Sequence, residues 1–375
     1  MDRFVASFNS DMPRSPTILF AGGGSLGHLV PSLAVLGELK KMRHDTRAVF
    51  VCADRREETE RLLQAGYSFH VLRAPKSPRG FSLSLLAFPT SFIASCRQAK
   101  KILREVRPDV VFSKGGSVSV PVCLMAKFLR IPIVLHESDS VMSVSTKFIA
   151  KFATVICTGF PVTILPSRYK TIARHTGNPV RAELRTASVS AGKRITGFSG
   201  RRPVVMIIGG SQGSVALNNA VSTALTELLN LADIIHLTGV GKMKTASHAR
   251  YFVRPSVTDD LPHLYAISDV VVSRAGAGVL SELSALGKPA IIIPLTGVAH
   301  DHQLRNAEYL RKEDAVLLLP QEHIATLGTV IETLLDDESR RKKLGSALQR
   351  AFPSDAAKTI ASIVLAEASS SQIQS

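Results

Sequence analysis

Short apolar runs recur along the first half of the chain, separated by longer stretches with a helical pattern. An opening run, PTILFAGGG, enters a glycine loop, and further runs lie at residues 48–52, 109–112, 131–135 and 154–157. Intervening stretches such as LVPSLAVLGELKKM and FIASCRQAKKILREV have helical periodicity. Because strands alternate with helices, we predict parallel sheets built by right-handed crossovers.

The pattern weakens around residues 183–202, which are rich in Ser, Gly, Arg and Lys, and it restarts with PVVMIIGGSQG. We therefore predict an N-terminal α/β domain, a linker region and a C-terminal α/β domain, over residues 1–182, 183–203 and 204–350. Strands of the second domain are expected near residues 204–208, 234–237, 269–273, 290–294 and 315–319. Residues 351–375 are expected to form a terminal helix, over about 355–368, that packs back towards the N-terminal domain, and a disordered tail. Residues 1–15 are expected to be disordered.

Composition adds a strong positive charge to this picture. The 375 residues include 46 Lys and Arg against 30 Asp and Glu, a formal net charge of +16. Such a balance favours an anionic partner, namely nucleic acid, an anionic membrane surface or a phosphorylated substrate, and a basic surface without a specific partner is the alternative. Aromatic residues make up only 6% and do not alternate with basic ones, so nucleic acid is not an expected partner.

Cysteine usage and hydropathy predict a cytoplasmic protein with peripheral membrane contact at most. The four cysteines are widely spaced, without a C-x-x-C motif, so neither a zinc site nor a disulfide framework is expected. The N-terminus has no signal-peptide core, and no run reaches 18 apolar residues. Residues 74–93 combine Lys76 and Arg79 with apolar side chains, a pattern that suits an anionic bilayer surface. Packing of this segment into the core is the alternative.

The segment 273–307 has the pattern of half a nucleotide-sugar site. An apolar run ends at Ser273, and a small-residue loop, a short helix and a second apolar run follow. Backbone N–H groups of the loop and the helix N-terminus can approach a phosphate. The carboxylate of Glu282 can accept hydrogen bonds from a ribose, and Gln303 and Asn306 add amide groups just beyond the next strand.

Two glycine loops after predicted strands are further candidates for phosphate contact. The loop at residues 22–31, GGGSLGHLVP, satisfies G-x-G-x-x-G, and its His28 can act as a general base near neutral pH. A histidine that only packs the helix start is the alternative. In the loop at residues 209–219, Ser211 and the following N–H groups can hold a diphosphate oxygen, or Ser211 can simply cap a helix.

Three more polar turns lie where they can reach a cleft. Residues 114–121, KGGSVSVP, form a glycine turn that can accept a second substrate or serve as a tight connection. Residues 136–140, HESDS, follow a predicted strand, and His136 and Glu137 can face a site or form a buried structural pair. Arg181, in GNPVR, can point into the cleft or into solvent.

The order of these motifs resembles the MurG family, the peptidoglycan N-acetylglucosaminyltransferases that convert lipid I to lipid II. The resemblance spans roughly residues 17–320, and six motifs in one order make it specific. In the first half, residues 22–31 match the family's G-G-G-T-G-G-H-x-x-P segment, residues 136–139 its HEQN-type segment, and residues 177–181 its G-N-P-V-R segment. In the second half, residues 209–213 match G-G-S-Q-G, residues 274–290 match R-x-G-A…S-E…G-x-P-A, and residues 302–307 match H-Q-x-x-N-A.

The resemblance implies a GT-B glycosyltransferase fold, in which two Rossmann-like parallel-sheet domains face each other across a cleft. The N-terminal domain would bind the acceptor and the membrane, and the C-terminal domain would bind UDP-GlcNAc. The implied reaction is inverting transfer of GlcNAc to the muramyl 4-hydroxyl of lipid I, with no cofactor and no metal. The protein would work peripherally at the cytoplasmic face of the inner membrane, on its anionic inner leaflet.

The resemblance also assigns residues to this site. His28 is the implied catalytic base, and Asp139 stands where the family has an asparagine that contacts the GlcNAc. The other implied substrate-binding residues are Ser25, Leu26 and Gly27 near the donor diphosphate and sugar, Arg181 and Ser211 on the nucleotide side including the diphosphate, Ala277, Gly278, Val279, Leu280, Ser281 and Glu282 around uridine and ribose, and Gln303 near the GlcNAc hydroxyls.

Three departures from the family pattern leave other functions open. Leu26 replaces a loop glycine and so removes φ freedom, and Ser138 and Asp139 replace a Gln-Asn pair. An ionised aspartate accepts hydrogen bonds but cannot donate them. The alternatives are a related glycosyltransferase with another lipid acceptor, such as diacylglycerol, and a nucleotide-sugar-binding protein without turnover. An NAD-dependent dehydrogenase is a more distant one.

Overall fold

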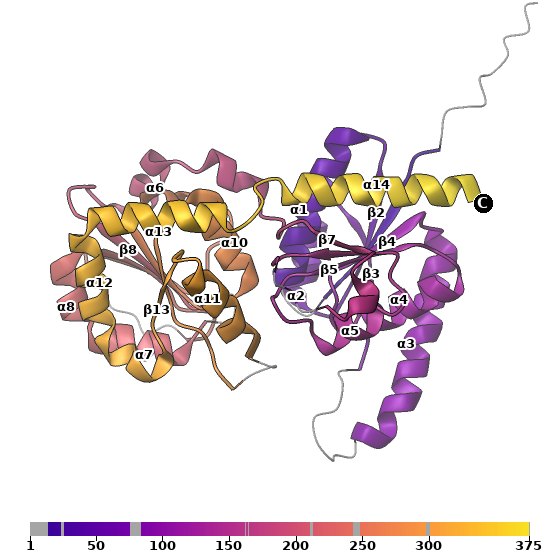
Figure 1. The fold of residues 1–375 in the computed structure, drawn as a ribbon, viewed down its shortest axis with the longest axis horizontal. Helices are drawn as coiled ribbons and strands as arrows, with labels where there is room; N and C mark the ends of the chain where they lie inside the picture. The colour runs from indigo at the N-terminus through magenta and orange to yellow at the C-terminus, as the bar shows by residue number, and fades with distance from the viewer. Residues whose placement is uncertain are drawn as a thin grey trace, which may run out of the picture.

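Two parallel β-sheets form the centres of two halves of the molecule (Figure 1). The computed structural model describes residues 14–23, 26–75, 84–161, 163, 165–210, 213–242, 248–297 and 301–374. Within these residues one sheet has seven strands and the other has six. In both sheets the first strand of the half lies centrally, and the chain moves outward on one side before it crosses to the other. This is the doubly wound arrangement that the alternating pattern predicts.

The N-terminal sheet has the order β3-β2-β1-β4-β5-β6-β7. Its strands are β1 (Thr17–Ala21), β2 (Arg47–Cys52), β3 (Ser68–Val71), β4 (Val110–Ser113), β5 (Ile133–Glu137), β6 (Val155–Thr158) and β7 (Ala173–His175). One face packs on α1 (Leu26–Met42), α2 (Arg56–Gln64) and α14 (Ala356–Gln374), and the other on α3 (Ser84–Val106), α4 (Ser119–Phe128) and α5 (Val144–Ile149).

The C-terminal sheet has the order β10-β9-β8-β11-β12-β13. Its strands are β8 (Val204–Ile208), β9 (Asp233–Leu237), β10 (Tyr251–Arg254), β11 (Val270–Ser273), β12 (Ala290–Ile292) and β13 (Leu317–Leu318). One face packs on α9 (Leu261–Ile267), α10 (Ala277–Leu286) and α11 (His302–Lys312), and the other on α7 (Val215–Thr223), α8 (Leu225–Leu231) and α12 (Leu327–Asp336). The next helix, α13 (Glu338–Arg350), contributes Leu348 to the core on the first of these faces and Leu344 to the core on the second.

The central strands read as continuous apolar runs because helices cover both of their faces. In β1, Ile18 and Phe20 join the core under α1 and α14, whereas Leu19 and Ala21 join the core under α3 and α4. This alternation follows from the two-residue period of a strand. All paired strands are parallel, so their carboxyl ends lie on one edge of each sheet.

Two segments differ from the sequence expectation. The predicted linker contains a 3-10 helix, η2 (Ala182–Thr186), and an α-helix, α6 (Val189–Thr196), that packs on α9 of the C-terminal half. The terminal helix α14 continues to Gln374, where a disordered tail was expected from about residue 369. In this serine-rich end, Ser370 Oγ donates to the carbonyl of Ala366 within the helix, and Gln372 Nε2 donates to the carbonyl of Arg14.

The last helix returns to the first half of the molecule. After α13 the chain crosses over, and α14, drawn in yellow in Figure 1, lies against α1 on the N-terminal half. Ile360, Ala361 and Val364 are fully buried there. Across the part of the chain that the structure describes, no helix is long and apolar enough to cross a membrane.

Candidate active site

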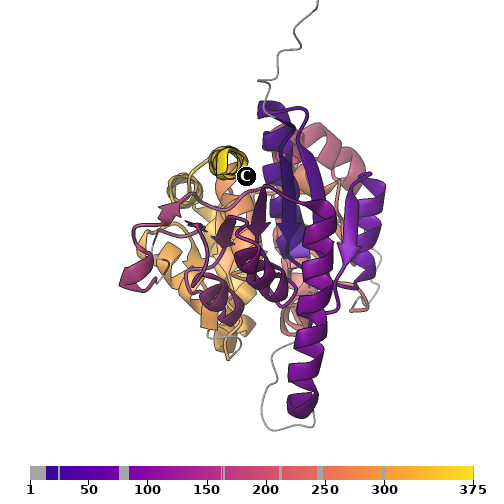
Figure 2. The same cartoon turned by 90° about the vertical axis from the view of Figure 1, so that its right-hand side faces the viewer.

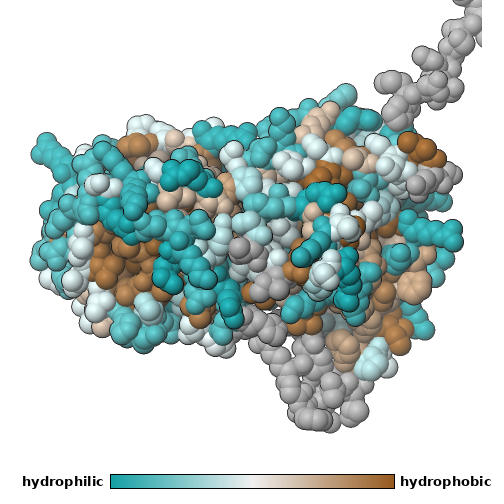
Figure 3. All heavy atoms as spheres, in the orientation of Figure 1, coloured by the Kyte–Doolittle hydropathy of each residue, from teal (hydrophilic) through white to brown (hydrophobic). Residues whose placement is uncertain are grey.

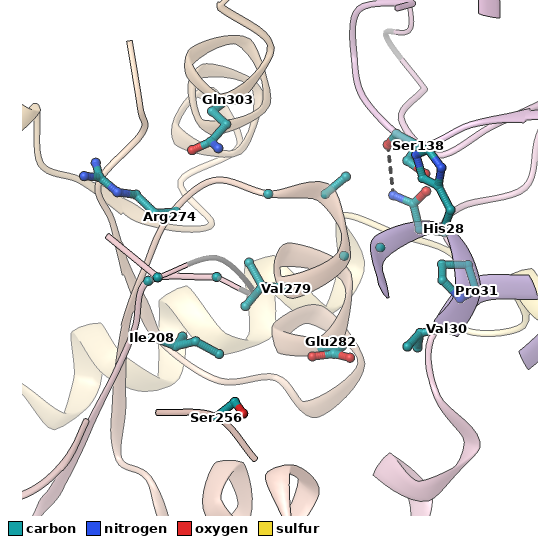
Figure 4. Close-up of a pocket in the computed structure, with 18 of the residues that line it drawn as sticks. His28, Val30, Pro31, Ser138, Ile208, Ser256, Arg274, Val279, Glu282 and Gln303 are labelled. Atoms are coloured by element: carbon teal, nitrogen blue, oxygen red, sulfur yellow. Dashed lines mark hydrogen bonds between the residues drawn. The ribbon is translucent and has the colours of Figure 1, made fainter. Parts of the chain in front are cut away.

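A cleft of about 1120 Å³ lies where the carboxyl ends of the two sheets face each other, and residues of both halves line it (Figure 4). The loops after β1, β4 and β5 form one wall, and the loops after β8 and β11 form the other. Ligands of doubly wound sheets bind at this edge, beside the point where the strand order reverses. In Figure 4, His28 and Glu282 lie on opposite walls.

His28 lies in the first turn of α1, and its side chain packs against the glycines Gly22 and Gly116. A Cβ atom placed on Gly116 would come within 2.9 Å of His28 Cε1, so the imidazole packs where only glycine fits. His28 Nδ1 is buried without a hydrogen-bond partner among the described residues. Burial, and then the positive charge of Lys114, lower the pKa of His28 to about 4, against an opposing interaction with the Gly23 backbone. The ring is therefore neutral near pH 7 and can accept a proton.

The loop after β5 is held by buried polar groups. Glu137 accepts hydrogen bonds from the backbone N–H groups of Asp139 (3.0 Å) and Ser143 (3.1 Å), and from Thr146 Oγ1 (2.5 Å). Burial raises the pKa of Glu137, and these donors oppose that rise. Because its oxygens are occupied by the loop, Glu137 shapes the turn that carries Asp139.

Asn306 joins the two walls of the cleft. Its Nδ2 donates to Asp139 Oδ1 (2.8 Å) and to the carbonyl of Ala275 (3.2 Å), and its Oδ1 accepts from the N–H and the hydroxyl of Ser140 (both 2.9 Å). The side chain is fully buried. Nearby, Asn178 Nδ2 donates to the carbonyl of Ser138 and to Ser281 Oγ. These amides fix the orientation of the loop after β5 against the C-terminal half.

Replacement of Asn306 with alanine is expected to lower the free energy of unfolding by about 2–3 kcal/mol, because it leaves buried groups of both walls without partners. Urea denaturation followed by circular dichroism measures the change. Replacement of the exposed Asn230 with alanine is the matched control. Equal stability of the two variants would mean that Asn306 does not hold the walls together.

Glu282 and Arg181 form an ion pair across the two halves. Arg181 Nε donates to Glu282 Oε1 at 2.7 Å, and the hydroxyl of Tyr265 donates to Glu282 Oε2 at 3.2 Å. Arg181 Nη1 also donates to the carbonyl of Thr258 (3.1 Å). The Tyr265 side chain is fully buried, so its hydroxyl is a rigid support for the carboxylate. Glu282 is thus held at the cleft surface by one charged and one neutral donor.

Arg274 anchors the glycine loop after β8. Its guanidinium donates to Ser214 Oγ at 2.6 and 3.1 Å, to Gln321 Oε1 at 2.8 Å and to the carbonyl of Ile293 at 3.0 Å. Ser214 is also the N-cap of α7, where its hydroxyl accepts from the N–H of Leu217. A buried, fully bonded arginine therefore sets the entry of the loop into the helix.

The structure brings most of the predicted site residues together. Those that line the cleft are Gly27, His28, Asp139, Arg181, Ala277, Gly278, Val279, Glu282 and Gln303. Ser25 and Ser211 lie outside the described residues, as does the side chain of Leu26. Gln303 Oε1 accepts a hydrogen bond from the N–H of Leu295 at 3.1 Å.

Leu280 and Ser281 do not line the cleft, contrary to the prediction. Leu280 is fully buried in the core beneath α10, and Ser281 donates to the carbonyl of Ala277 within the helix. The reason is the 3.6-residue period of a helix, which turns these positions away while Val279 and Glu282 face the cleft. Lys114, Tyr265 and Arg274 were not predicted as site residues. Lys114 and Arg274 stand within the predicted motifs, and Tyr265 had no recognisable signal.

Comparisons with known proteins agree with this architecture. The glycosyltransferase family 28 N-terminal domain matches residues 18–158, and the glycosyltransferase family 28 C-terminal domain matches residues 204–360. A crystal structure of MurG from Acinetobacter baumannii superposes with a TM-score of 0.71 at 20% identity, over 94% of this chain and 99% of that one. This likeness confirms the predicted GT-B fold.

Two curated relatives carry the name UDP-N-acetylglucosamine–N-acetylmuramyl-(pentapeptide) pyrophosphoryl-undecaprenol N-acetylglucosamine transferase. The protein from Clostridium kluyveri is 36% identical over 308 residues, which cover 81% of this chain and 86% of the relative. The protein from Lachnoclostridium phytofermentans is 32% identical over 354 residues, which cover 92% and 98%. The chain therefore belongs to this family of N-acetylglucosaminyltransferases, the MurG family, and is a hexosyltransferase with both family 28 domains.

Proposed function

We propose that this protein transfers GlcNAc from UDP-GlcNAc to the muramyl 4-hydroxyl of lipid I and so forms lipid II. The observation that carries the proposal is the cleft, with a neutral histidine on one wall and an anchored carboxylate on the other, in a member of this family. The N-terminal half, residues 1–182, would bind the acceptor and the membrane, and residues 204–350 would bind the donor.

The donor would lie on the C-terminal wall. Ribose hydroxyls would donate to the Glu282 carboxylate, which accepts hydrogen bonds from Arg181 and Tyr265 and has further lone pairs. The diphosphate would meet the N-terminus of α10 and the glycine loop after β8, where N–H groups and the helix dipole favour an anion. Gln303 and Asp139 would contact the sugar from either side.

The reaction would be a single inverting displacement at the anomeric carbon. The 4-hydroxyl oxygen forms the new bond to this carbon as the bond to the UDP oxygen breaks. His28 takes the hydroxyl proton, a role that its neutral state at pH 7 allows. The charge that develops on UDP is stabilised by backbone N–H groups, the dipole of α10 and Arg181.

The direct test is transfer of labelled GlcNAc from UDP-GlcNAc to lipid I, with lipid II as the expected product. Diacylglycerol as the acceptor and UDP-galactose as the donor are the comparison arms. Turnover with diacylglycerol but not with lipid I would replace the proposed acceptor. Binding of UDP-GlcNAc without turnover on either acceptor would mean that the protein is a binding protein rather than an enzyme.

We further propose that α3 contacts the anionic inner leaflet peripherally, at the cytoplasmic face of the inner membrane. This helix extends away from the body of the protein (Figure 2), and apolar side chains are visible on its exposed part at the lower right of Figure 3. Phe88 and Phe92 stack there at 5.9 Å, and Ile93 is half exposed. Exposed Arg97, Lys100 and Lys101 follow on the same helix. Residues 76–83 of the candidate segment lie outside the described residues.

The double replacement Phe92→Ser and Ile93→Ser is expected to weaken binding to vesicles with anionic lipid by at least about tenfold. The reason is that two apolar side chains are no longer transferred from water into the bilayer on binding. Sedimentation with vesicles measures the change. Val189→Ser, at an equally exposed apolar position on α6, is the matched control. Unchanged vesicle binding of the double variant would rule out α3 as the contact.

A further inference from the structure

Lys114 is a buried lysine that follows β4 and lines the cleft. Its side chain is 4% exposed. Its Nζ lies 2.5 Å from His136 Nδ1 and 2.6 Å from Ser138 Oγ. Lys114 therefore connects the glycine turn after β4 to the loop after β5, and the proposed function gives it no role.

The neighbouring groups determine the direction of these hydrogen bonds. His136 Nε2 lies 2.9 Å from the carbonyl of Gly177, which can only accept, so Nε2 carries the proton. Burial and the charge of Lys114 hold the pKa of His136 well below its usual value, so Nδ1 is a free acceptor. The Lys114 ammonium consequently donates to His136 and to Ser138. Burial lowers the pKa of Lys114 to about 8, while Glu137 and Asp139 raise it, so most molecules carry the ammonium at pH 7.

Lys114 also lies beside His28. A Cβ atom placed on Gly22 would come within 3.3 Å of Lys114 Cβ and 3.4 Å of His28 Cβ, so the two side chains flank the same glycine. Other charged groups stand on the elements around His28 and across the cleft. They are Glu57, Glu60 and Arg61 on α2, Lys358 and Glu367 on α14, Glu137 and Asp139 after β5, Arg181 before η2, and Glu282 on the opposite wall. Of all these charges, that of Lys114 is the one that lowers the pKa of His28.

We propose that Lys114 is a positioning residue for the transfer reaction, whose ammonium group holds the loop from His136 to Asp139 and places a positive charge beside the proposed base His28. The proposal rests on the proposed function in taking His28 as the base. It also gives the two departures from the HEQN-type segment a common explanation. Ser138 provides an acceptor for the ammonium, and the ammonium balances the charge that Asp139 adds where the family has an amide.

The test compares Lys114→Met with the wild-type protein by two measurements. The first is NMR titration of the His28 ring, with its resonance assigned by its loss in His28→Ala. We expect the pKa of His28 to rise by about 1 pH unit in Lys114→Met, because a nearby positive charge has been removed. The second is steady-state kinetics at pH 7. There kcat is expected to fall by about tenfold, because the loop from His136 to Asp139 loses its hydrogen bonds to Lys114, while KM for UDP-GlcNAc stays within about threefold.

Lys288→Met is the matched control. Lys288 is also a lysine with a lowered pKa, and its Nζ donates to the carbonyls of Ala266 and Ser268 in the C-terminal half, away from the cleft. Its loss is expected to lower stability and to leave the pKa of His28 unchanged. If Lys114→Met does not fold, Lys114→Gln provides the same test, since the amide keeps a donor for Ser138 but carries no charge.

An unchanged pKa of His28 in the uncharged variant would overturn the proposal, as would a tenfold rise in KM with an unchanged kcat. The titration needs no acceptor. A protein that fails to transfer GlcNAc to lipid I, but in which the pKa of His28 depends on Lys114, would therefore contradict the proposed function alone.

Discussion

Replacement of His28 with alanine is expected to lower kcat for GlcNAc transfer by about 10²- to 10⁴-fold, the usual contribution of a general base. The dissociation constant for UDP is expected to change by less than about threefold, because His28 lies on the wall opposite Glu282. Stopped-time transfer assays with saturating donor give the first quantity, and isothermal titration with UDP gives the second. His44→Ala, which removes an exposed histidine just beyond α1, is the matched control.

The pH dependence provides an independent check on His28. A base is available only when it is unprotonated, so kcat/KM should stay level through neutral pH and decline as the pH falls through about 4. An ordinary, solvent-exposed histidine would instead give a decline near pH 6.5. Equal losses of transfer rate and of donor affinity in His28→Ala would identify His28 as a structural residue.

Replacement of Glu282 with alanine is expected to raise the dissociation constants of UDP-GlcNAc and of UDP alike by about 10- to 100-fold, because a charged acceptor for the ribose is lost. The effect should be the same for both ligands, since both carry the ribose. Isothermal titration on protein that is shown to be folded by its thermal midpoint measures it. Glu282→Gln should weaken binding less, because the amide oxygen still accepts.

The Glu282→Ala variant needs a control because Glu282 also forms an ion pair with Arg181. Among the described residues, loss of the carboxylate also leaves the guanidinium of Arg181, which is 15% exposed, with the Thr258 carbonyl as its one remaining hydrogen-bond partner. Some of the measured loss therefore comes from rearrangement of the wall. Glu183→Ala, at an exposed position in η2, reports the effect of removing a carboxylate without this contact. Unchanged affinity of Glu282→Ala for UDP would refute the ribose contact.

The central strands and the edge strand β13, expected near residues 315–319, were predictable from the sequence, whereas the edge strands β3, β7 and β10 were not. Val204–Ile208 and Ile133–Glu137 lie inside the sheets and are buried on both faces, so they appear as apolar runs. The strands β3 (SFHV), β7 (ARH) and β10 (YFVR) lie at sheet edges and carry polar residues, so hydropathy does not distinguish them from turns. Helix α6 was missed because Ser, Gly, Arg and Lys dominate its segment.

The part of the candidate site that was predictable consists of residues that come just after the carboxyl ends of strands. Because parallel strands bring their carboxyl ends to one edge, the glycine loops and Glu282 could be placed at one cleft from their order alone. The hydrogen bonds and ion pairs within the site could not be predicted from the sequence. Asp139 and Asn306 are 167 positions apart, and Arg181 and Glu282 are 101 apart, so the contacts depend on how two domains meet. Lys114 stands within a predicted motif, but its partners His136 and Ser138 belong to the neighbouring strand β5 and the loop after it, which the sequence alone does not place beside β4.

The return of α14 to the first half has a consequence for how the protein is made. The N-terminal sheet is the first to leave the ribosome, and N-terminal domains usually fold first during synthesis. Here, however, one face of that sheet is completed by Ile360, Ala361 and Val364, which are translated only after the whole C-terminal sheet. The nascent N-terminal half must therefore keep an apolar surface uncovered until translation is nearly finished. In this chain, the core of the domain that is made first is completed by the segment that is made last.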